Sequence, residues 1–322
     1  MSASVSRREV VVGISAVAVA SVLPLGAARA AGGALNFLVI GDWGRDGASH
    51  QRDVAAQMGK AAEAIDSRFV VAVGDNFYDN GVQTAQDAQW KSSFEDVYTA
   101  PSLQKPWHAL LGNHDYRGNP QAQLDYAQTS PRWRMPARYY KVEGASVGAP
   151  FVDLFMLDTS PMVHKYRTKV EGVIARNVAT QDVATQLAWL DRELAASKAA
   201  WKIVCGHHTV YSGGSQHGNT PELIELIKPI FERHGVQAYI NGHDHDMQHI
   251  HVGGVDYICA GAGSEVRPVA PIAGTRFCVS RSGFAQVAID EESLGLEFKD
   301  YAGVSVYRAT LPRIRTDRAS AA

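Results

Sequence analysis

The amino-acid sequence predicts a layered α/β sandwich that becomes rich in strands toward its C-terminal end. Short apolar runs of strand length, rich in β-branched and aromatic residues, alternate with amphipathic stretches of helical period over most of the chain. Strands joined by short turns follow them. Strands buried by the helices that connect them are typical of layered α/β folds.

The expected elements follow one another without a linker or an internal repeat. Strands are expected at Leu35–Ile40, Phe69–Val73, Trp107–Leu111, Phe151–Leu157, Trp201–Cys205 and Val236–Ile240, and later at Val255–Ala260, Gly283–Ile289, Leu294–Asp300 and Val304–Ala309. Apolar residues three and four positions apart predict helices at Arg52–Ser67, Asp182–Ser197 and Pro221–His234. We therefore expect one domain over residues 35–312 and a tail over 313–322.

The composition is that of a globular protein. The 322 residues are 46% apolar and 20% charged, with a formal net charge of −2. Without residues 1–30, 28 basic and 32 acidic side chains remain, a net charge of −4. Nucleic acids bind through an excess of Lys and Arg, so we expect no nucleic-acid partner. Three cysteines are too few for a disulfide scaffold, although Cys259 and Cys278 could pair outside the cytoplasm.

Residues 1–30 have the features of an export signal. Arg7 and Arg8 precede an uncharged apolar stretch that ends near Leu25, and residues 28–30 (Ala-Arg-Ala) match a signal-peptidase site. The arginine pair resembles a twin-arginine signal, with a general secretory signal as the alternative. The stretch is too short and too rich in small residues for a membrane span. We expect a periplasmic or secreted protein, with the twin-arginine machinery as the precursor's partner and no stable membrane insertion after cleavage.

Five apolar runs end in motifs that contain metal-ligand residue types. The motifs are Gly41-Asp42-Trp43-Gly44, Gly74-Asp75-Asn76-Phe77-Tyr78, Gly112-Asn113-His114-Asp115, Gly206-His207-His208 and Gly242-His243-Asp244-His245. The carboxyl ends of strands in α/β sheets are where loops converge on a site. One such residue would be an ordinary turn or core residue, but five in succession predict a metal site.

The ligand types indicate which metals fit this site. Oxygen ligands are offered by Asp42, Asp75, Tyr78 and Asn113, and nitrogen ligands by His207, His243 and His245. This set suits iron, manganese or zinc rather than a thiolate site. Seven ligands suggest two ions that share a carboxylate. In an extended chain His243 and His245 would point the same way, and Asp244 would turn away to orient a histidine ligand.

The ordered motifs resemble those of the metallophosphoesterase superfamily. Tyr78, three residues after Asp75, makes the sequence similar to the purple acid phosphatases of the small, mammalian tartrate-resistant type. The resemblance covers roughly residues 35–312 and implies two mixed β-sheets flanked by helices. It implies ferric iron at Asp42, Tyr78 and His245, a divalent ion (iron, zinc or manganese) at Asn113, His207 and His243, a bridge at Asp75, and catalytic roles for His114 and, allowing one inserted residue, His217.

The same resemblance implies an exported acid phosphatase. It would hydrolyse phosphate monoesters, either small molecules or phosphoproteins, by attack of a metal-bound hydroxide, and His114 would donate a proton to the leaving oxygen. The alternatives are a phosphodiesterase or nucleotidase, a di-iron redox protein, and a binding protein without catalysis. Tyr78 argues against the diesterase, because typical divalent-metal diesterases lack a tyrosinate ligand.

Three further features lie outside the ligand motifs. Ser160–Thr180 lacks a clear period; it corresponds in position to the loop over the family's active site, or it is a surface loop without that role. Arg267 and Lys165 are candidates to neutralise a phosphate. His208 and Thr209 stand where the family usually has Tyr-Pro, so the resemblance does not define the shape of the pocket here.

Overall fold

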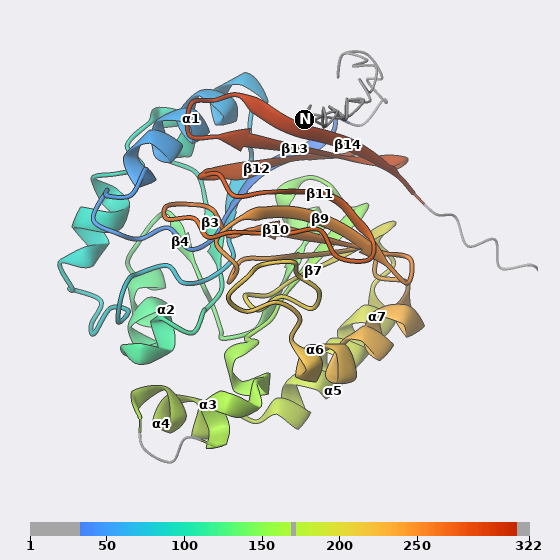
Figure 1. Cartoon of the computed structure of the whole chain (residues 1–322), viewed down its shortest axis with the longest axis horizontal. Helices are drawn as coiled ribbons and strands as arrows, with labels where there is room; N and C mark the ends of the chain where they lie inside the picture. Colours follow the sequence, from blue (N-terminus) through green and yellow to red (C-terminus); the bar gives the residue numbers. More distant parts are fainter. Residues whose placement is uncertain (1–32, 169–171, 314–322) are drawn as a thin grey trace, which may run out of the picture.

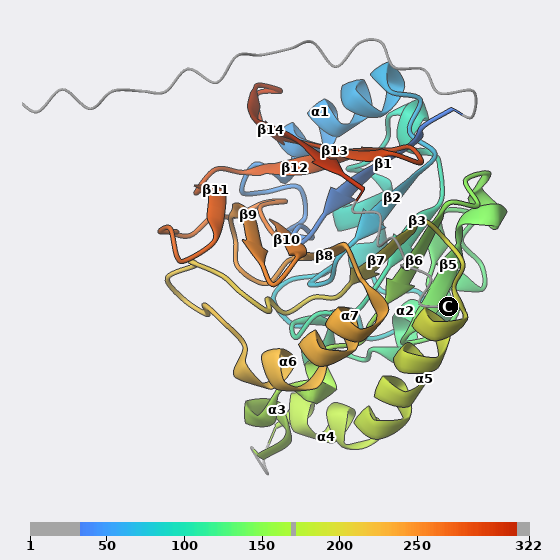
Figure 2. The same cartoon turned by 90° about the vertical axis from the view of Figure 1, so that its right-hand side faces the viewer.

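Two β-sheets stack face to face between outer helices. The computed structural model describes residues 33–168 and 172–313, so the expected signal and nearly all of the expected tail lie outside the described residues. Helix α1 (Gln51–Ala64) covers the first sheet, and α5 (Val183–Ala196), α6 (Pro221–Leu226) and α7 (Lys228–His234) cover the second (Figures 1 and 2). The predicted sandwich of two mixed sheets flanked by helices is confirmed.

The first sheet has the order β14-β13-β12-β1-β2-β3-β4 among the described residues. Strands β1 to β4 are parallel, whereas β12, β13 and β14 each run antiparallel to their neighbours. The bounds are β1 Leu35–Ile40, β2 Phe69–Ala72, β3 Trp107–Ala109, β4 Trp133–Arg134, β12 Gly283–Ile289, β13 Ser293–Asp300 and β14 Ser305–Pro312.

The second sheet repeats this plan, with the order β11-β9-β10-β8-β7-β6-β5 in the described part of the chain. Strands β6, β7, β8 and β10 are parallel, and β5, β9 and β11 are antiparallel to their neighbours. The bounds are β5 Tyr140–Glu143, β6 Val152–Met156, β7 Trp201–Cys205, β8 Ala238–Asn241, β9 Met247–Val252, β10 Val255–Ala260 and β11 Thr275–Val279.

The predicted helix at Pro221–His234 is two helices, α6 and α7, which meet at Ile227. Pro229 explains the break, because proline has no amide hydrogen to donate to the carbonyl one turn earlier. The other helices are α2 (Gln121–Ala127), α3 (His164–Thr168) and α4 (Val173–Ala179). Short 3-10 or π turns occupy Trp90–Glu95, Pro101–Leu103, Asp115–Arg117, Gly144–Val147 and Ser160–Met162. None of the described helices has both the length and the apolarity needed to cross a bilayer.

The cysteines expected to be able to pair do not form a disulfide. Cys259 lies on β10 and Cys278 on β11, and both stand opposite Gln248 of β9, the strand between them. Two strand spacings of about 4.8 Å separate their backbones, which exceeds the reach of a disulfide. Both thiols are free, as is that of Cys205.

A cluster of aromatic rings supports the loops that follow β1 and β2. The ring of Trp43 is fully buried and lies 5.4–6.3 Å, between centroids, from those of Phe77, Phe94, Tyr98, Trp107 and Trp133. Trp43 directly follows Asp42, and Phe77 directly precedes Tyr78. The cluster therefore fixes two loops that end in candidate ligands.

Phe94 provides a test of this support. Its ring is fully buried against Tyr98, Trp107 and Trp133, so Phe94→Ala should lower the free energy of unfolding by about 3–5 kcal/mol in a denaturant titration. Val304 is 54% exposed, and Val304→Ala is the matched control, expected to change stability by less than about 0.5 kcal/mol. Equal midpoints for the two variants would contradict a structural role for the cluster.

Candidate metal centre and active-site cavity

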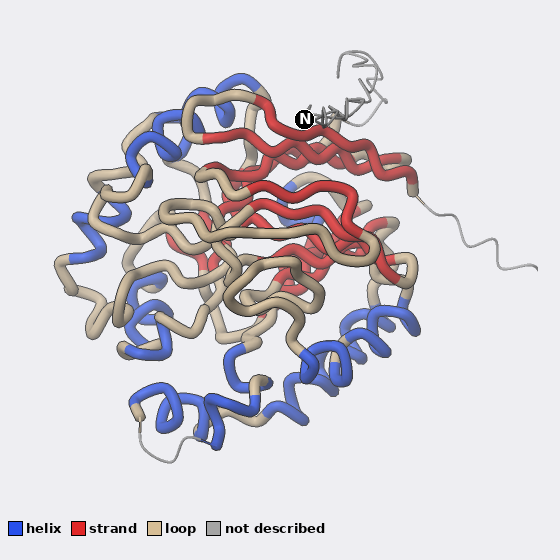
Figure 3. The backbone as a smooth tube through the Cα atoms, viewed as in Figure 1, coloured by secondary structure: helices blue, strands red, loops and turns tan. Residues whose placement is uncertain are grey.

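The ligand motifs of both sheets meet at the carboxyl ends of parallel strands. Asp42, Asp75 and Asn113 follow β1, β2 and β3, and His207 and His243 follow β7 and β8. Backbone hydrogen bonds connect these loops, including Asp42 N to Gly74 O at 3.0 Å and Gly242 N to His207 O at 3.1 Å. Figure 3 shows loops gathered around the ends of the stacked strands. The expected convergence of the five motifs is observed.

The first group of ligand atoms surrounds the hydroxyl of Tyr78. This oxygen lies 2.9 Å from Asp42 Oδ1, 3.1 Å from Asp75 Oδ2 and 3.0 Å from His245 Nε2. All four side chains are buried. They are the residues expected at the ferric site, together with the expected bridge.

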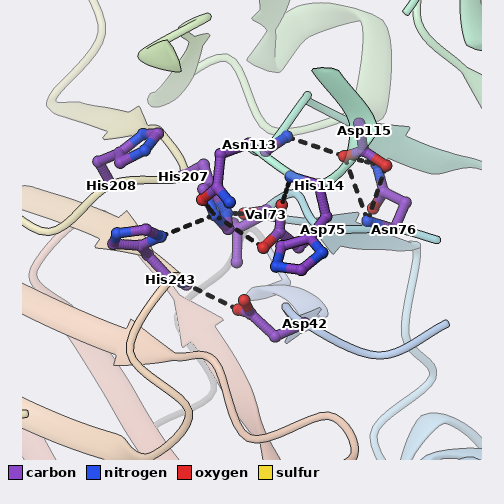
Figure 4. A network of polar contacts seen from close by, with 12 residues as sticks. Asp42, Val73, Asp75, Asn76, Asn113, His114, Asp115, His207, His208 and His243 are labelled. Atoms are coloured by element: carbon purple, nitrogen blue, oxygen red, sulfur yellow. Dashed lines mark hydrogen bonds and ion pairs between the residues drawn. The ribbon is translucent and has the colours of Figure 1, made fainter. Parts of the chain in front are cut away.

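The second group surrounds Nε2 of His207. This nitrogen lies 3.3 Å from Asn113 Oδ1, 3.2 Å from His243 Nδ1 and 3.4 Å from Asp75 Oδ2 (Figure 4). These are the residues expected at the divalent site. Asp75 Oδ2 belongs to both groups, so one carboxylate joins two clusters of ligand atoms.

The orientation of the ligand atoms fits bound cations. His207 Nδ1 lies 2.9 Å from the carbonyl oxygen of Val73, so in the neutral ring that a cation would bind the proton is on Nδ1 and Nε2 presents a lone pair. Nδ1 of His243 lies only 3.2 Å from His207 Nε2. A cation between them would satisfy both, and Asp42, Asp75 and His207 form a set of potential ligands within 4.8 Å of one another.

Burial and charge set the protonation of Asp75 and Tyr78. Burial alone would raise the pKa of Asp75, but the His207 ring and the amide of His114 bring it below its usual range, so Asp75 is a carboxylate. Burial, with the charges of Asp42 and Asp75, raises the pKa of Tyr78 well above its ordinary value. A cation coordinated by this phenol would oppose all three effects and favour the tyrosinate.

Strained backbone positions the ligands. Asp42, Asp75 and His243 have positive φ angles of 60°, 48° and 73°, in the left-handed region that residues with a side chain rarely adopt. Such conformations persist only where the surrounding structure enforces them, and they concentrate at functional sites. Two glycines allow the close approach: a Cβ on Gly112 would lie 2.2 Å from Asp75 Oδ1, and one on Gly242 2.4 Å from Asp42 Oδ2.

The expectation that the chain is extended at His243 and His245 is wrong, although the rings of both residues lie among the candidate ligands. The segment is a turn with His243 in the left-handed region, not a strand. Asp244 also differs from expectation. Its carboxylate accepts a short hydrogen bond from the hydroxyl of Ser212, so it fixes the loop before α6 instead of orienting a histidine ligand.

His114 lies beside the centre, as expected for a catalytic histidine. Its amide donates to Asp75 Oδ1 at 2.7 Å, and its Nδ1 lies 2.6 Å from the carbonyl oxygen of Asp79. The ring lies 4.4 Å from that of Tyr78 and lines the active-site cavity. Burial lowers the pKa of His114 and Arg117 lowers it further, against the opposing charge of Asp75.

His217 also lines the cavity, which supports its alignment with one inserted residue. Its ring stacks on that of His243, with centroids 4.0 Å apart, and Arg267 Nη1 lies 3.3 Å from its Nε2. Burial, Lys165 and Arg267 lower the pKa of His217 to about 4. The neutral ring accepts from Arg267 at Nε2 and therefore carries its proton on Nδ1.

The cavity above the two clusters has a volume of about 480 Å³ and a basic rim. The cavity is lined by three basic side chains, those of Arg117, Lys165 and Arg267. Lys165 and Arg267 were proposed from the sequence, and Arg117 was not. One wall comes from Ser160–Thr180, which forms the 3-10 turn, α3 and α4 in its described part. Asn177 of α4 donates to the carbonyl oxygens of Tyr116 and Gly118, both at 2.8 Å. The segment thus lies over the site.

Asp115 is a residue of the site that the sequence did not assign. Its carboxylate accepts from the amides of Gly112 at 2.8 Å and Asn76 at 3.1 Å, and from Gln123 Nε2 at 2.8 Å (Figure 4). It therefore holds the loop of Asp75 against the loop of Asn113. Its position next to His114 in the motif could have identified Asp115 from the sequence. No motif marks Gln123, which lies on α2.

The fold and the site define a metallophosphoesterase. The chain belongs to the calcineurin-like phosphoesterase family, whose model matches residues 35–247. It is 42% identical over 287 residues to purple acid phosphatase 3 of Arabidopsis thaliana, covering 84% of this chain and 76% of the relative. It is 33% identical over 301 residues to human tartrate-resistant acid phosphatase type 5, covering 87% and 91%. The resemblance to the purple acid phosphatases is thereby confirmed.

Solved structures agree on the fold. GAP50, described as the anchor in the inner membrane complex of Plasmodium, superposes with a TM-score of 0.76 at 25% identity, covering 88% of this chain and 90% of that one. Purple acid phosphatase PPD1 from yellow lupin seeds superposes with a TM-score of 0.64 at 16% identity, covering 87% and 54%. The two-sheet architecture is therefore shared with a purple acid phosphatase.

Proposed function

We propose that this protein is an acid phosphatase that hydrolyses phosphate monoesters at a dinuclear metal centre. The observation that carries the proposal is the Asp75 carboxylate, whose Oδ2 lies 3.1 Å from Tyr78 Oη and 3.4 Å from His207 Nε2. One bridging carboxylate between two ligand groups is the arrangement that a pair of ions requires. The names of the relatives, purple and tartrate-resistant acid phosphatases, support the same activity.

The donor atoms differ between the two groups, and so do the ions that suit them. Ferric iron would be held by Asp42, Tyr78, His245 and the shared Asp75, a mainly oxygen set. Iron, zinc or manganese in the divalent state would be held by Asn113, His207, His243 and Asp75. Bound there, the two ions would activate a water molecule and neutralise charge on the phosphoryl oxygens.

The protein's own groups would bind the phosphate and protonate the leaving group. Nδ1 of His114 is engaged by the carbonyl of Asp79, so the opposite nitrogen is the one that can give a proton to the leaving oxygen. His217 and Arg267 would donate hydrogen bonds to phosphoryl oxygens. Tyr78 among the ligand atoms favours this activity over a divalent-metal diesterase, and the complete ligand set favours catalysis over binding alone.

The proposal also covers the substrate class and the cellular location of the protein. A cavity of about 480 Å³ with a basic rim suits a small phosphomonoester or the phosphorylated side chain of a phosphoprotein. Arg7, Arg8 and the apolar stretch after them support export through the twin-arginine machinery to the periplasm or beyond.

Replacement of Arg7 and Arg8 tests the export route. The double variant Arg7→Lys, Arg8→Lys keeps the charge of the signal but removes the arginine pair, so uncleaved precursor should accumulate in the cytoplasm. Immunoblots of cell fractions measure this, with Arg29→Lys as the control outside the pair. Normal export of the double variant would favour the general secretory signal.

His114→Ala tests the acid chemistry. Its kcat on an alkyl phosphate should fall about 10²–10⁴-fold, and less on a nitrophenyl phosphate, whose better leaving group needs less protonation. Because burial lowers the pKa of His114 below the usual 6.5, its acid form is present at low pH. Turnover of the alkyl ester should therefore decline as pH rises through that pKa, and the variant should lose this limb. His50→Ala, at an exposed histidine, should keep wild-type kinetics. Equal losses on both esters with depleted metal would contradict the role.

Tyr78→Phe tests the ferric site. A tyrosinate bound to ferric iron absorbs visible light, so the wild type should be purple or pink and the variant should lose that band. Absorption spectra and metal analysis of both proteins measure this, and Tyr98→Phe, at a buried tyrosine of the aromatic cluster, should keep the colour. A colourless, iron-free and fully active wild type would overturn the ferric assignment.

A further inference from the structure

We propose that the Tyr166 hydroxyl donates a hydrogen bond to the substrate's phosphate, and that Thr159 and His208 orient this hydroxyl. The proposal rests on the proposed phosphatase function and adds a binding residue to it. Tyr166 lies on α3, in the segment that covers the site, and lines the cavity together with Asp75, His217 and His243. The direction of its hydroxyl hydrogen follows from four hydrogen bonds.

The first bonds fix the hydroxyl of Thr159. Its Oγ1 accepts hydrogen bonds from the amides of His207 at 3.2 Å and His208 at 3.1 Å. These two donors use both lone pairs of the oxygen. The third contact of Oγ1, with His208 Nδ1 at 2.9 Å, is therefore one in which Thr159 donates its own hydrogen.

This contact fixes the tautomer of His208. Nδ1 accepts from Thr159, so the ring proton is on Nε2, which lies 3.3 Å from Tyr166 Oη. His208 is buried, with its ring 4.3 Å from that of His243, and Figure 4 shows it beside the second ligand group. His208 thus donates to the oxygen of Tyr166 and cannot accept from it.

The hydrogen of the Tyr166 hydroxyl is consequently available to a ligand. His208 occupies an acceptor position on Oη, and no other hydrogen bond engages this hydroxyl within the described ranges 33–168 and 172–313. Burial raises the pKa of Tyr166 above its ordinary value, so the hydroxyl stays protonated. A donor at a cavity wall, with its hydrogen unused, is suited to an anionic acceptor.

The other polar groups of the cavity favour the same kind of ligand. Lys165 Nζ lies 5.0 Å from the centre of the Tyr166 ring, and Arg267 and Arg117 stand at the rim. Among the residues that the structure describes, the carboxylate that lines the cavity is that of Asp75, which already belongs to both ligand groups. Donors thus surround the cavity, and phosphate, with several acceptor oxygens, matches them.

Binding of inorganic phosphate to the metal-loaded protein tests the proposal. Tyr166→Phe should raise the Kd of phosphate, measured by calorimetry, about tenfold, the lower end of what a hydrogen bond to a charged group contributes. KM for a phosphomonoester should rise in parallel, and metal content should not change. Tyr140→Phe is the matched control, because it removes a buried hydroxyl bonded to Ala109 and Arg134, away from the cavity, and should leave Kd unchanged.

A double-mutant cycle tests the orienting role of His208. If His208 acts through Tyr166, His208→Phe should weaken phosphate binding in the wild type but add nothing in the Tyr166→Phe background. Additive losses of affinity would overturn the orienting role of His208. An unchanged Kd in Tyr166→Phe would overturn the binding role of Tyr166 even if His208→Phe did not fold. A wild type that hydrolyses monoesters while Tyr166→Phe binds normally would defeat this inference alone; a wild type that neither binds phosphate nor hydrolyses would defeat the proposed function as well.

Discussion

The carboxylate of Asp75 is the constraint on which the rest of the site depends. One oxygen, Oδ2, faces both Tyr78 and His207, and the other accepts the amide of His114. A buried carboxylate in this position repels the neighbouring oxygen ligands of Asp42 and Asn113 unless cations lie between them. The surrounding structure therefore has to hold these oxygen ligands close together, which requires the loops that carry them to be rigid.

Two features supply this rigidity. The rings of Trp43 and Phe77 are buried and belong to the loops of Asp42 and Tyr78, so their packing holds those backbones in place. Asp115 binds the amides of Gly112 and Asn76, which ties the loop of Asn113 to that of Asp75. Left-handed backbone at Asp42 and Asp75 is tolerated because these contacts leave the loops no alternative path.

The convergence of the candidate ligands and the positions of the central strands along the chain were predictable, because each motif follows an apolar run of strand length. Edge strands such as β4, with two residues, have too little sequence to be detected. The break between α6 and α7 depends on Pro229. The apolar pattern continues across this proline with a helical period, so it predicted one helix. Asp244 shows the limit of local rules: the segment is not extended, and only the tertiary fold brings Ser212 to the Asp244 carboxylate.

The segment over the site is joined to the metal loops by the same residues that shape the cavity. Thr159 precedes the segment and accepts from the amide of His207, a candidate ligand, while Tyr166 within it contacts His208, the next residue. Asn177 binds the turn after His114. The covering wall is thus bonded to both sides of the centre, beside His207 and beside His114. A shift of α3 or α4 would therefore change the donors presented to a phosphate without requiring the ligands themselves to move.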